Sequence, residues 1–96
     1  MLDSKRIRTR SLKRLWADGD ASGINADWLS RIERYLAMLN DASEPSDLDI
    51  PGWHFHALKG DRKGQYSLRV SGNWRLVFEW DKDGSHSVTL EDYHGK

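Results

Sequence analysis

The pattern of apolar positions predicts two helices in the first half of the chain. Between residues 28 and 39, apolar side chains recur three and four positions apart, the spacing of one buried helix face. Asn25, just before them, is a suitable N-cap. A shorter helix with the same spacing is predicted around residues 12–16 and ends at the glycine-containing segment GDASG. Residues 2–9 are predicted to form a short edge strand, protected from aggregation by its lysine and arginine side chains.

From Trp53 onward the apolar period changes from 3.6 to 2, which predicts four strands in series. The pairs Gly72-Asn73 and Asp83-Gly84 are tight-turn signals, so at least the last three strands should form an antiparallel meander. The acidic, proline-containing segment DASEPSDLDIPG is predicted to be the loop that leads from the helices to the sheet. The expected fold class is therefore α+β: one domain, residues 1–96, with two N-terminal helices packed on one face of a small antiparallel sheet. The predicted strand segments are WHFHAL, QYSLRVS, WRLVFEW and HSVTL.

The sheet face away from the helices is expected to be open and to carry reactive side chains. Strand alternation assigns to it imidazole, guanidinium, phenol and carboxylate groups. The loop LKGDRKG adds Lys59, Arg62 and Lys63 next to two glycines, a combination that suits a phosphate or an RNA backbone. The same loop also fits an ordinary solvated hairpin. The residues assigned to this face are His54, His56, Ser67, Arg69, Arg75, Val77, Glu79, Glu91 and Tyr93.

Charge is unevenly distributed although the formal net charge is zero. Residues 1–16 carry six basic groups and one acid, residues 59–75 carry five and one, and residues 40–50 carry four acids and no base. Clustered lysine and arginine can bind phosphate even in a neutral protein. The alternative is a solvated surface of mixed charge.

Composition narrows the class of protein further. The chain has no cysteine, which excludes disulfides and thiolate chemistry and fits a reducing compartment. No apolar run approaches the roughly 18 residues of a membrane span, and the basic N-terminus lacks the apolar stretch of a secretory signal. We therefore expect a cytoplasmic location, no membrane association and no export.

Two histidines in HFH offer a metal-binding interpretation. In an extended strand His54 and His56 would point the same way, about 7 Å apart. Together with His94 they could form a three-histidine zinc site of a metal-dependent hydrolase. This motif is common by chance and no carboxylate-rich surroundings are evident, so the favoured interpretation has no metal.

The chain resembles the HigB toxins of the RelE-like superfamily of bacterial type II toxin-antitoxin systems. The resemblance rests on HALKGDRKGQYSLRVSGNWRLVFEW and the final EDYH, and extends upstream through RTRSLKRLWADGDASGI and SDLDIPGWHFH. It implies a ribosome-dependent endoribonuclease that cuts messenger RNA in the A site of the 70S ribosome and is silenced by a HigA-like helix-turn-helix antitoxin. No cofactor is implied, and we expect the free toxin to be a monomer.

Carried over residue by residue, the resemblance assigns the catalytic residues. His94 would be the general base and His56 the general acid or a ligand of the phosphate, and the acid and base assignments can be exchanged. Lys59 and Arg75 would bind the phosphate and stabilise the transition state of its cleavage. Asp92 would orient an imidazole and Tyr93 would position the nucleotide. The catalytic set is His56, Lys59, Arg75, Asp92, Tyr93 and His94, and the set expected to bind RNA or the ribosome is Arg62, Lys63, Arg69 and Asn73.

The chain departs from the family pattern in two ways. Ala57 stands where the family usually has proline after the motif histidine, and the chain is neutral where many relatives are basic. The second departure argues against strong binding to free RNA. A non-catalytic ribosome- or RNA-binding module of the same fold is the alternative function.

Overall fold

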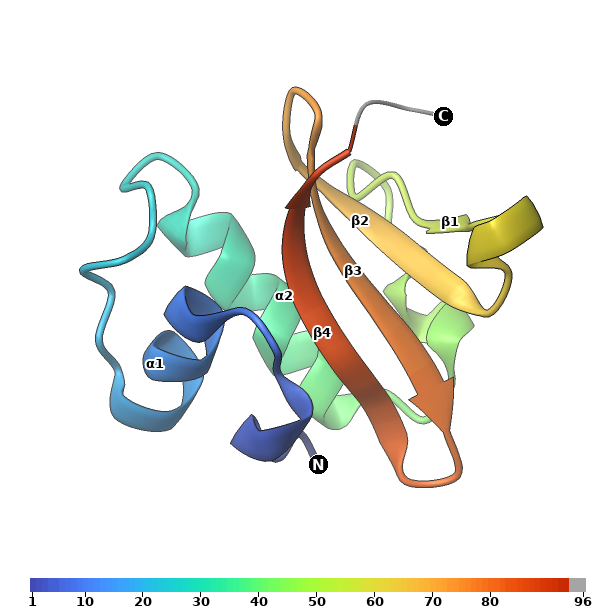
Figure 1. Cartoon of the computed structure of the whole chain (residues 1–96), viewed down its shortest axis with the longest axis horizontal. Coiled ribbons are helices and arrows are strands. Elements are labelled where there is room, and N and C mark those ends of the chain that lie inside the picture. The colour runs from blue at the N-terminus through green and yellow to red at the C-terminus, as the bar shows by residue number, and fades with distance from the viewer. Residues whose placement is uncertain (94–96) are drawn as a thin grey trace.

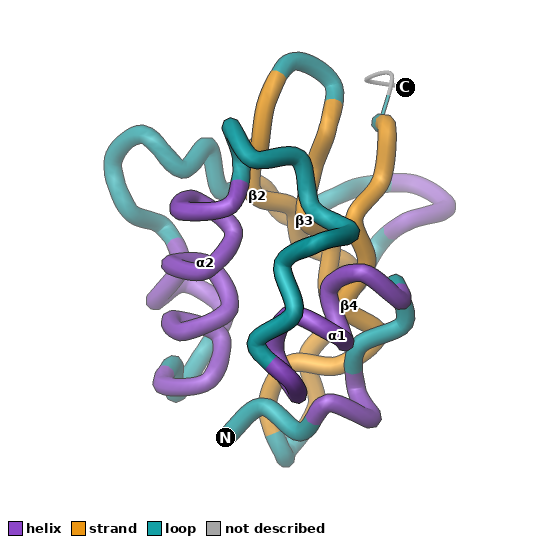
Figure 2. The backbone as a smooth tube through the Cα atoms, turned by 90° about the vertical axis from the view of Figure 1, so that its left-hand side faces the viewer, coloured by secondary structure: helices purple, strands orange, loops and turns teal. Residues whose placement is uncertain are grey.

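Two helices lie on one side of a four-stranded sheet in the computed structural model, which describes residues 1–93 (Figures 1 and 2). Viewed from the helix side, α1 and α2 lie in front of the strands (Figure 2). This arrangement confirms the predicted α+β fold. The helices are α1 (Arg10–Asp18) and α2 (Leu29–Asp41), the strands are β1 (His56–Ala57), β2 (Gln65–Ser71), β3 (Trp74–Asp81) and β4 (Gly84–Asp92), and short 3-10 turns are η1 (Ser4–Arg6), η2 (Pro45–Leu48) and η3 (Gly60–Arg62).

The sheet is an antiparallel meander in the order β1-β2-β3-β4, as the turn signals predicted. Gly72 lies in the β2–β3 turn with a φ of 54°, and Gly84 follows the β3–β4 turn as the first residue of β4 with a φ of 106°, a backbone region that favours glycine. The end of β4 lies against the β2–β3 turn, where the backbone N–H of Tyr93 donates to the carbonyl oxygen of Asn73 at 2.7 Å. The C-terminal end of the described chain is thereby held beside the central strands.

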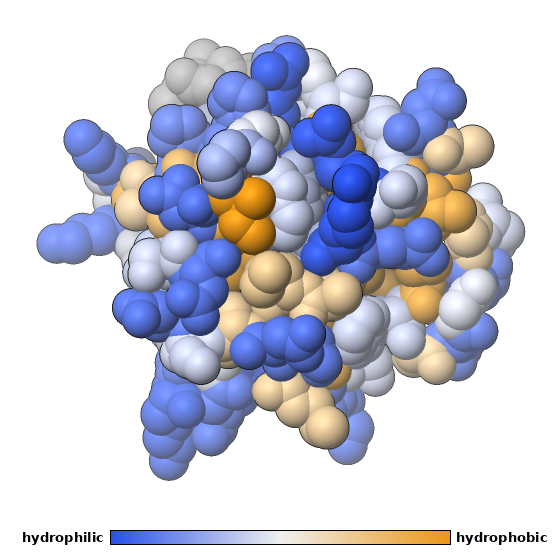
Figure 3. Space-filling model, turned by 180° about the vertical axis from the view of Figure 1, so that it is seen from behind, coloured by the Kyte–Doolittle hydropathy of each residue, from blue (hydrophilic) through white to orange (hydrophobic). Residues whose placement is uncertain are grey.

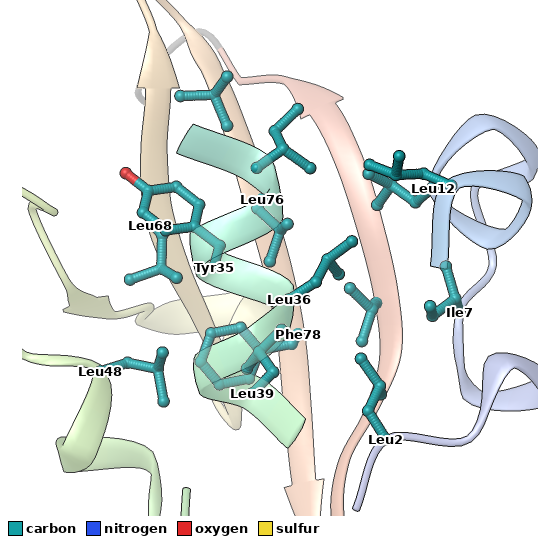
Figure 4. Close-up of a cluster of buried hydrophobic side chains, with 14 of the residues drawn as sticks. Leu2, Ile7, Leu12, Tyr35, Leu36, Leu39, Leu48, Leu68, Leu76 and Phe78 are labelled. Atoms are coloured by element: carbon teal, nitrogen blue, oxygen red, sulfur yellow. The ribbon is translucent and has the colours of Figure 1, made fainter. Parts of the chain in front are cut away.

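The hydrophobic core lies between α2 and the sheet (Figure 4). The predicted stripe of α2 is buried at Ile32, Tyr35, Leu36 and Leu39. It packs against alternate side chains of the strands, while Leu2, Ile7 and Leu12 extend the core from the N-terminal segment (Figure 4). Removing this apolar surface from water stabilises the layer arrangement. The buried strand residues of the core are Leu68, Val70, Leu76, Phe78 and Val88.

The prediction of an edge strand at residues 2–9 was wrong. The carboxylate of Asp3 accepts a hydrogen bond from the backbone N–H of Lys5 at 2.9 Å, which starts the helical turn η1. Only Ile7 then forms a bridge, a parallel one, with Val88 of β4. The segment thus contacts the edge strand β4 at a single bridge instead of adding a strand to the sheet.

The second helix begins one turn later than predicted. Asn25 does accept a hydrogen bond at its side chain, from the N–H of Asp27 at 2.9 Å, but this bond closes a turn. The carbonyl of Asn25 also accepts from the N–H of Trp28, and α2 starts at Leu29. An asparagine can stabilise an isolated turn as readily as a helix start, which explains the error.

The first predicted strand is reduced to two residues. His54 has a φ of 52°, which interrupts the extended backbone of WHFHAL. Before the interruption, the carbonyl of Trp53 still accepts from the N–H of Arg69, and pairing resumes at His56. His54 and His56 therefore do not follow one strand alternation. None of the helices in the described part of the chain is both long and apolar enough to span a membrane.

Candidate functional site: a hollow around Arg75

Four predicted catalytic residues line one hollow on the sheet face away from α2. The hollow has a volume of about 510 Å³, and we call it the Arg75 hollow. His56 comes from β1, Lys59 from the loop after it, Arg75 from β3 and Tyr93 from the end of β4. Among residues 1–93, the residues that line it are His56, Ala57, Leu58, Lys59, Gly60, Ser67, Arg75 and Tyr93.

The loop LKGDRKG holds Lys59 at the rim of the hollow. Its ends are closed by the N–H of Leu58, which donates to the carbonyl of Gln65 at 2.8 Å. Within it, Lys59 is extended and Gly60 turns with a φ of 65°, which starts η3. The ammonium group thus sits on a short, closed hairpin loop beside the strand that carries His56.

Arg75 is the unusual group of the site. It lies on the central strand β3, between Arg69 of β2 and Glu91 of β4 in the sheet register. Its side chain is half-buried, and its Nε and Nη1 atoms are buried without a hydrogen-bond partner among the described residues. Buried polar atoms, and charged ones above all, are normally hydrogen-bonded because desolvation is costly. A guanidinium left in this state is suited to bind an anion.

Arg62, predicted to contact RNA, is engaged within the protein. Its Nη2 atom donates to both carboxylate oxygens of Glu91, at 2.8 and 2.9 Å, and its Nε donates to Gln65 at 2.6 Å. Its guanidinium carbon also lies 5.4 Å from the ring centroid of Tyr93. Thr89 donates to the same carboxylate at 2.7 Å. The ion pair ties the lysine-bearing loop to the end of β4.

The C-terminal cluster is only partly described. Tyr93 lines the Arg75 hollow, and exposed Asp92 lines a neighbouring hollow together with Lys59 and Arg62. His94, the expected general base, lies outside the described residues. Asp92 is the last residue of β4, and Tyr93 is held by its hydrogen bond to Asn73.

The other predicted RNA-binding residues are spread around the site. Lys63 lines a hollow on the far side of its loop, next to Tyr66, and Arg69 lines a separate hollow with Arg31. Asn73 is exposed in the β2–β3 turn, where its carbonyl oxygen accepts a hydrogen bond from the N–H of Tyr93. The structure thus gathers the catalytic set more closely than the RNA-binding set.

The three-histidine zinc arrangement is not supported. His54 and His56 line different hollows, because the backbone interruption at His54 separates them. Across residues 1–93 no group of three or more histidine, aspartate or glutamate side chains is arranged to hold a metal ion.

Two residues of the site were not identified from sequence. Ser67 was assigned to an open face, yet it is buried at 2 % exposure and forms part of the floor of the Arg75 hollow. The sequence feature that could have indicated its burial is its position at the centre of a strand, between Tyr66 and Leu68. Glu91 was given no role, although it pairs with Arg62 across 29 positions of sequence. Sequence contains no direct signal for such a distant ion pair.

Comparison with known proteins agrees with the geometry. Residues 5–94 match the model of the family described as the RelE-like toxin of the type II toxin-antitoxin system HigB. The chain is 34% identical over 90 residues to a protein named Endoribonuclease HigB from Proteus vulgaris, covering 94% of this chain and 98% of that protein. It is 44% identical over 62 residues to Toxin HigB-1 from Vibrio cholerae serotype O1, covering 64% of each chain. Toxins of type II systems have an antitoxin as their partner. The chain therefore belongs to the HigB-like family of RelE-like toxins from type II toxin-antitoxin systems.

Proposed function

We propose that this toxin is an endoribonuclease that cuts messenger RNA in the A site of the translating 70S ribosome, without a metal ion, in the bacterial cytoplasm. The antitoxin that silences it would be a HigA-like protein with a helix-turn-helix domain. The relative from Proteus vulgaris is named an endoribonuclease, which supports the reaction class. Cleavage within a translated message would stop protein synthesis and arrest growth.

The observation that carries this proposal is the guanidinium of Arg75. Two of its nitrogens are buried at the hollow and have no hydrogen-bond partner among residues 1–93. A phosphodiester of RNA would supply the missing acceptors and a compensating charge. Lys59, at the rim of the same hollow, would add a second cation. Cations fixed before the substrate arrives stabilise the charge that develops in the transition state.

The reaction needs one proton removed and one supplied. The base takes the proton from the 2'-hydroxyl group, and the freed oxygen forms a new bond to phosphorus. The bond between phosphorus and the 5'-oxygen then breaks, and the acid protonates that oxygen. The products are a 2',3'-cyclic phosphate and a 5'-hydroxyl end. We assign the base to His94 on the family resemblance and the acid to His56, which lines the hollow.

The remaining residues would position the substrate. The ring of Tyr93 borders the hollow and could stack on a base, while Arg62 lies over it and limits its movement. Asp92 would orient an imidazole. Lys63, Arg69 and Asn73 would contact RNA of the message or of the ribosome.

The test is in vitro translation of a defined message, followed by primer extension to map cuts. We expect wild-type protein to cut the message only when ribosomes translate it. Arg75→Gln should slow cutting by about 10²–10³-fold, as expected when a preorganised charge donor is removed. His94→Ala should abolish it. Lys82→Gln, which neutralises an exposed cation in the β3–β4 turn, is the matched control and should cut like wild type.

The other outcomes separate the alternatives. Ribosome stalling without cuts would indicate a non-catalytic binding module, and cuts in naked RNA would indicate a general ribonuclease. Stoichiometric zinc in the active protein, measured by elemental analysis, would contradict the metal-independent reaction. Cutting by Arg75→Gln at the wild-type rate would remove the central argument.

A further inference from the structure

A second cationic hollow lies near the first and has no part in the chemistry proposed above. Its volume is about 330 Å³, and we call it the Arg31 hollow. Arg31 comes from α2, His54 from the segment before β1, and Arg69 from β2. Ser71 and Gly72, at the β2–β3 turn, complete it together with Gly52 and Val70. No acidic residue is among the described residues that line it, so these residues present cations without a carboxylate.

The walls of the Arg31 hollow are fixed by the core. The buried hydroxyl of Tyr35 donates to the carbonyl oxygen of Arg69, and Nη1 of Arg31 lies 3.4 Å from the same hydroxyl. The ring of Tyr35 packs edge-on against Trp53, with centroids 4.8 Å apart, and the carbonyl of Trp53 accepts from the N–H of Arg69 at 3.0 Å. Contacts therefore join α2, β2 and the segment before β1 before any ligand binds. This lowers the conformational entropy that is lost on binding.

The backbone at His54 is strained where it borders this hollow. Its φ of 52° is uncommon for a residue with a side chain, and His54 is exposed, so core packing does not explain it. Such strain persists where surrounding structure enforces it, and it concentrates at ligand sites. Here it turns the imidazole-bearing residue toward the Arg31 hollow and away from the strand alternation shared with His56.

The two hollows are connected through a pair of like charges. Arg69 and Arg75 are direct partners in the β2–β3 register, so their side chains leave the same sheet face about 5 Å apart at Cβ. Like charges directly opposite each other destabilise a sheet. Arg69 lines the Arg31 hollow and Arg75 lines the hollow named after it. A chain of anions running past both would offset the repulsion.

We infer that the Arg31 hollow binds a backbone phosphate of RNA next to the phosphate that is bound at Arg75. This inference rests on the proposed function, because it places a second phosphate of the same nucleic acid. Figure 3, which shows the molecule from behind, has hydrophilic side chains spread over that face with hydrophobic patches between them. The lining of the hollow, with its two arginines and one histidine, suits a polyanion better than an apolar partner. The phosphate could belong to the message or to ribosomal RNA, which have the same chemistry.

The test measures binding without cleavage. The probe is a short single-stranded RNA with 2'-O-methyl riboses, which cannot be cut by attack of the 2'-oxygen, and its dissociation constant is measured over a range of salt concentrations. Arg31→Gln and Arg69→Gln should each weaken binding and lower the slope of log K against log salt by about 0.7, the value for one lost phosphate contact with a single strand. Arg34→Gln, an exposed arginine of α2 outside the hollow, is the matched control and should keep the slope.

Ribosomes distinguish the two sources of the phosphate. Weaker binding of both variants to message-free ribosomes would assign the contact to ribosomal RNA. Weaker binding only to ribosomes programmed with the methylated message would assign it to the message. If both variants match wild type and Arg34→Gln on the oligonucleotide and on both ribosome preparations, the inference is wrong. That result would not contradict the proposed function, because it concerns binding at the Arg31 hollow alone. Conversely, if the toxin never cuts RNA, the salt slopes still show whether the Arg31 hollow binds a phosphate.

Discussion

Two clusters of basic side chains lie at the sheet, and they differ in the source of the negative charge that balances them. At the β3–β4 hairpin, Arg6 donates to the carboxylate of Asp81 at 3.1 Å and to the carbonyl of Ser85 at 3.2 Å. It also lies 3.6 Å from the carboxylate of Asp83, and Nε2 of His86 lies 3.9 Å from Asp81. We call these residues the Arg6 cluster. The chain itself provides its acids.

The Arg75 hollow has the same kinds of basic group without an acid. Arginine, lysine and histidine line it, and no aspartate or glutamate is among the described residues that line it. Two nitrogens of Arg75 have no partner in the described part of the chain. A cation that meets a carboxylate of its own chain can stabilise the fold, whereas a buried cation without one is costly to the fold, which is the ground for the anion proposed at Arg75.

Arg62 shows why this distinction matters for assignment. It lies in the basic loop beside the Arg75 hollow, and sequence alone suggested a contact with RNA. Its bidentate bond to Glu91 gives it a carboxylate partner within the protein, as Arg6 has. The contact of Arg62 with RNA stays a prediction, and any such contact would compete with this ion pair.

The largest expected effect comes from giving Arg75 an acid. Ser67→Asp would place a carboxylate on the same face of the sheet, diagonal to Arg75 and inside the hollow. The new ion pair would occupy the guanidinium, so cutting of the message on ribosomes should fall by about 10²-fold or more. Ser67→Asn, of similar size but neutral, should reduce the rate far less. Equal rates for Ser67→Asp and wild type, with both folded by circular dichroism, would refute the comparison.

The intermediate effect comes from removing the acid of Arg62. Glu91→Gln should lower the free energy of unfolding by up to about 1 kcal/mol, because the pair is partly exposed. The released guanidinium should then raise the salt slope of RNA binding by about 0.7, as one added phosphate contact. Chemical denaturation and the oligonucleotide titration measure the two changes. Glu33→Gln, an exposed residue of α2, is the control, and an unchanged slope in Glu91→Gln would contradict the idea.

Most of the fold could be predicted because it depends on local patterns. The stripe of α2, the strands β2 to β4 and both hairpin turns follow from apolar period and turn chemistry, which adjacent residues determine. The errors lie where a side chain forms a hydrogen bond with the backbone or where the backbone adopts a positive φ. Asp3 started a helical turn in place of a strand, and His54 broke β1 with a positive φ. Neither event leaves a trace in the alternation of apolar residues.

The site was predictable only in part, for a related reason. Family resemblance identified His56, Lys59, Arg75 and Tyr93, and the fold brings these four to one hollow. Sequence could not tell that Arg62 has a carboxylate partner while two nitrogens of Arg75 have no partner among residues 1–93, because pairing depends on contacts between segments far apart in the chain. The separation of His54 from His56 was missed for the same reason as the break in β1.

The smallest effect is expected in the Arg6 cluster, where the acid is structural and exposed. The hydrogen bond from Arg6 lowers the pKa of Asp81 below its ordinary 3.8, and the N–H of Asp83 adds to this. Folding therefore favours the ionised form, so the stabilisation is present above pH 3.8 and is lost as the pH falls through the lowered pKa. Asp81→Asn keeps the acceptor for Asp83 but loses the charge, and its Tm should lie slightly below that of wild type at neutral pH.

This Tm difference should shrink as the pH falls below 3.8 and as salt is added. Asp83→Asn is the matched control: its carboxylate is 64% exposed and farther from Arg6, so its Tm should change even less. Cutting of the message should be the same in both variants and in wild type, since neither carboxylate lines the Arg75 hollow. Slower cutting by Asp81→Asn at an unchanged Tm would show that the Arg6 cluster serves the reaction as well as the fold, and the division between the two clusters would no longer hold.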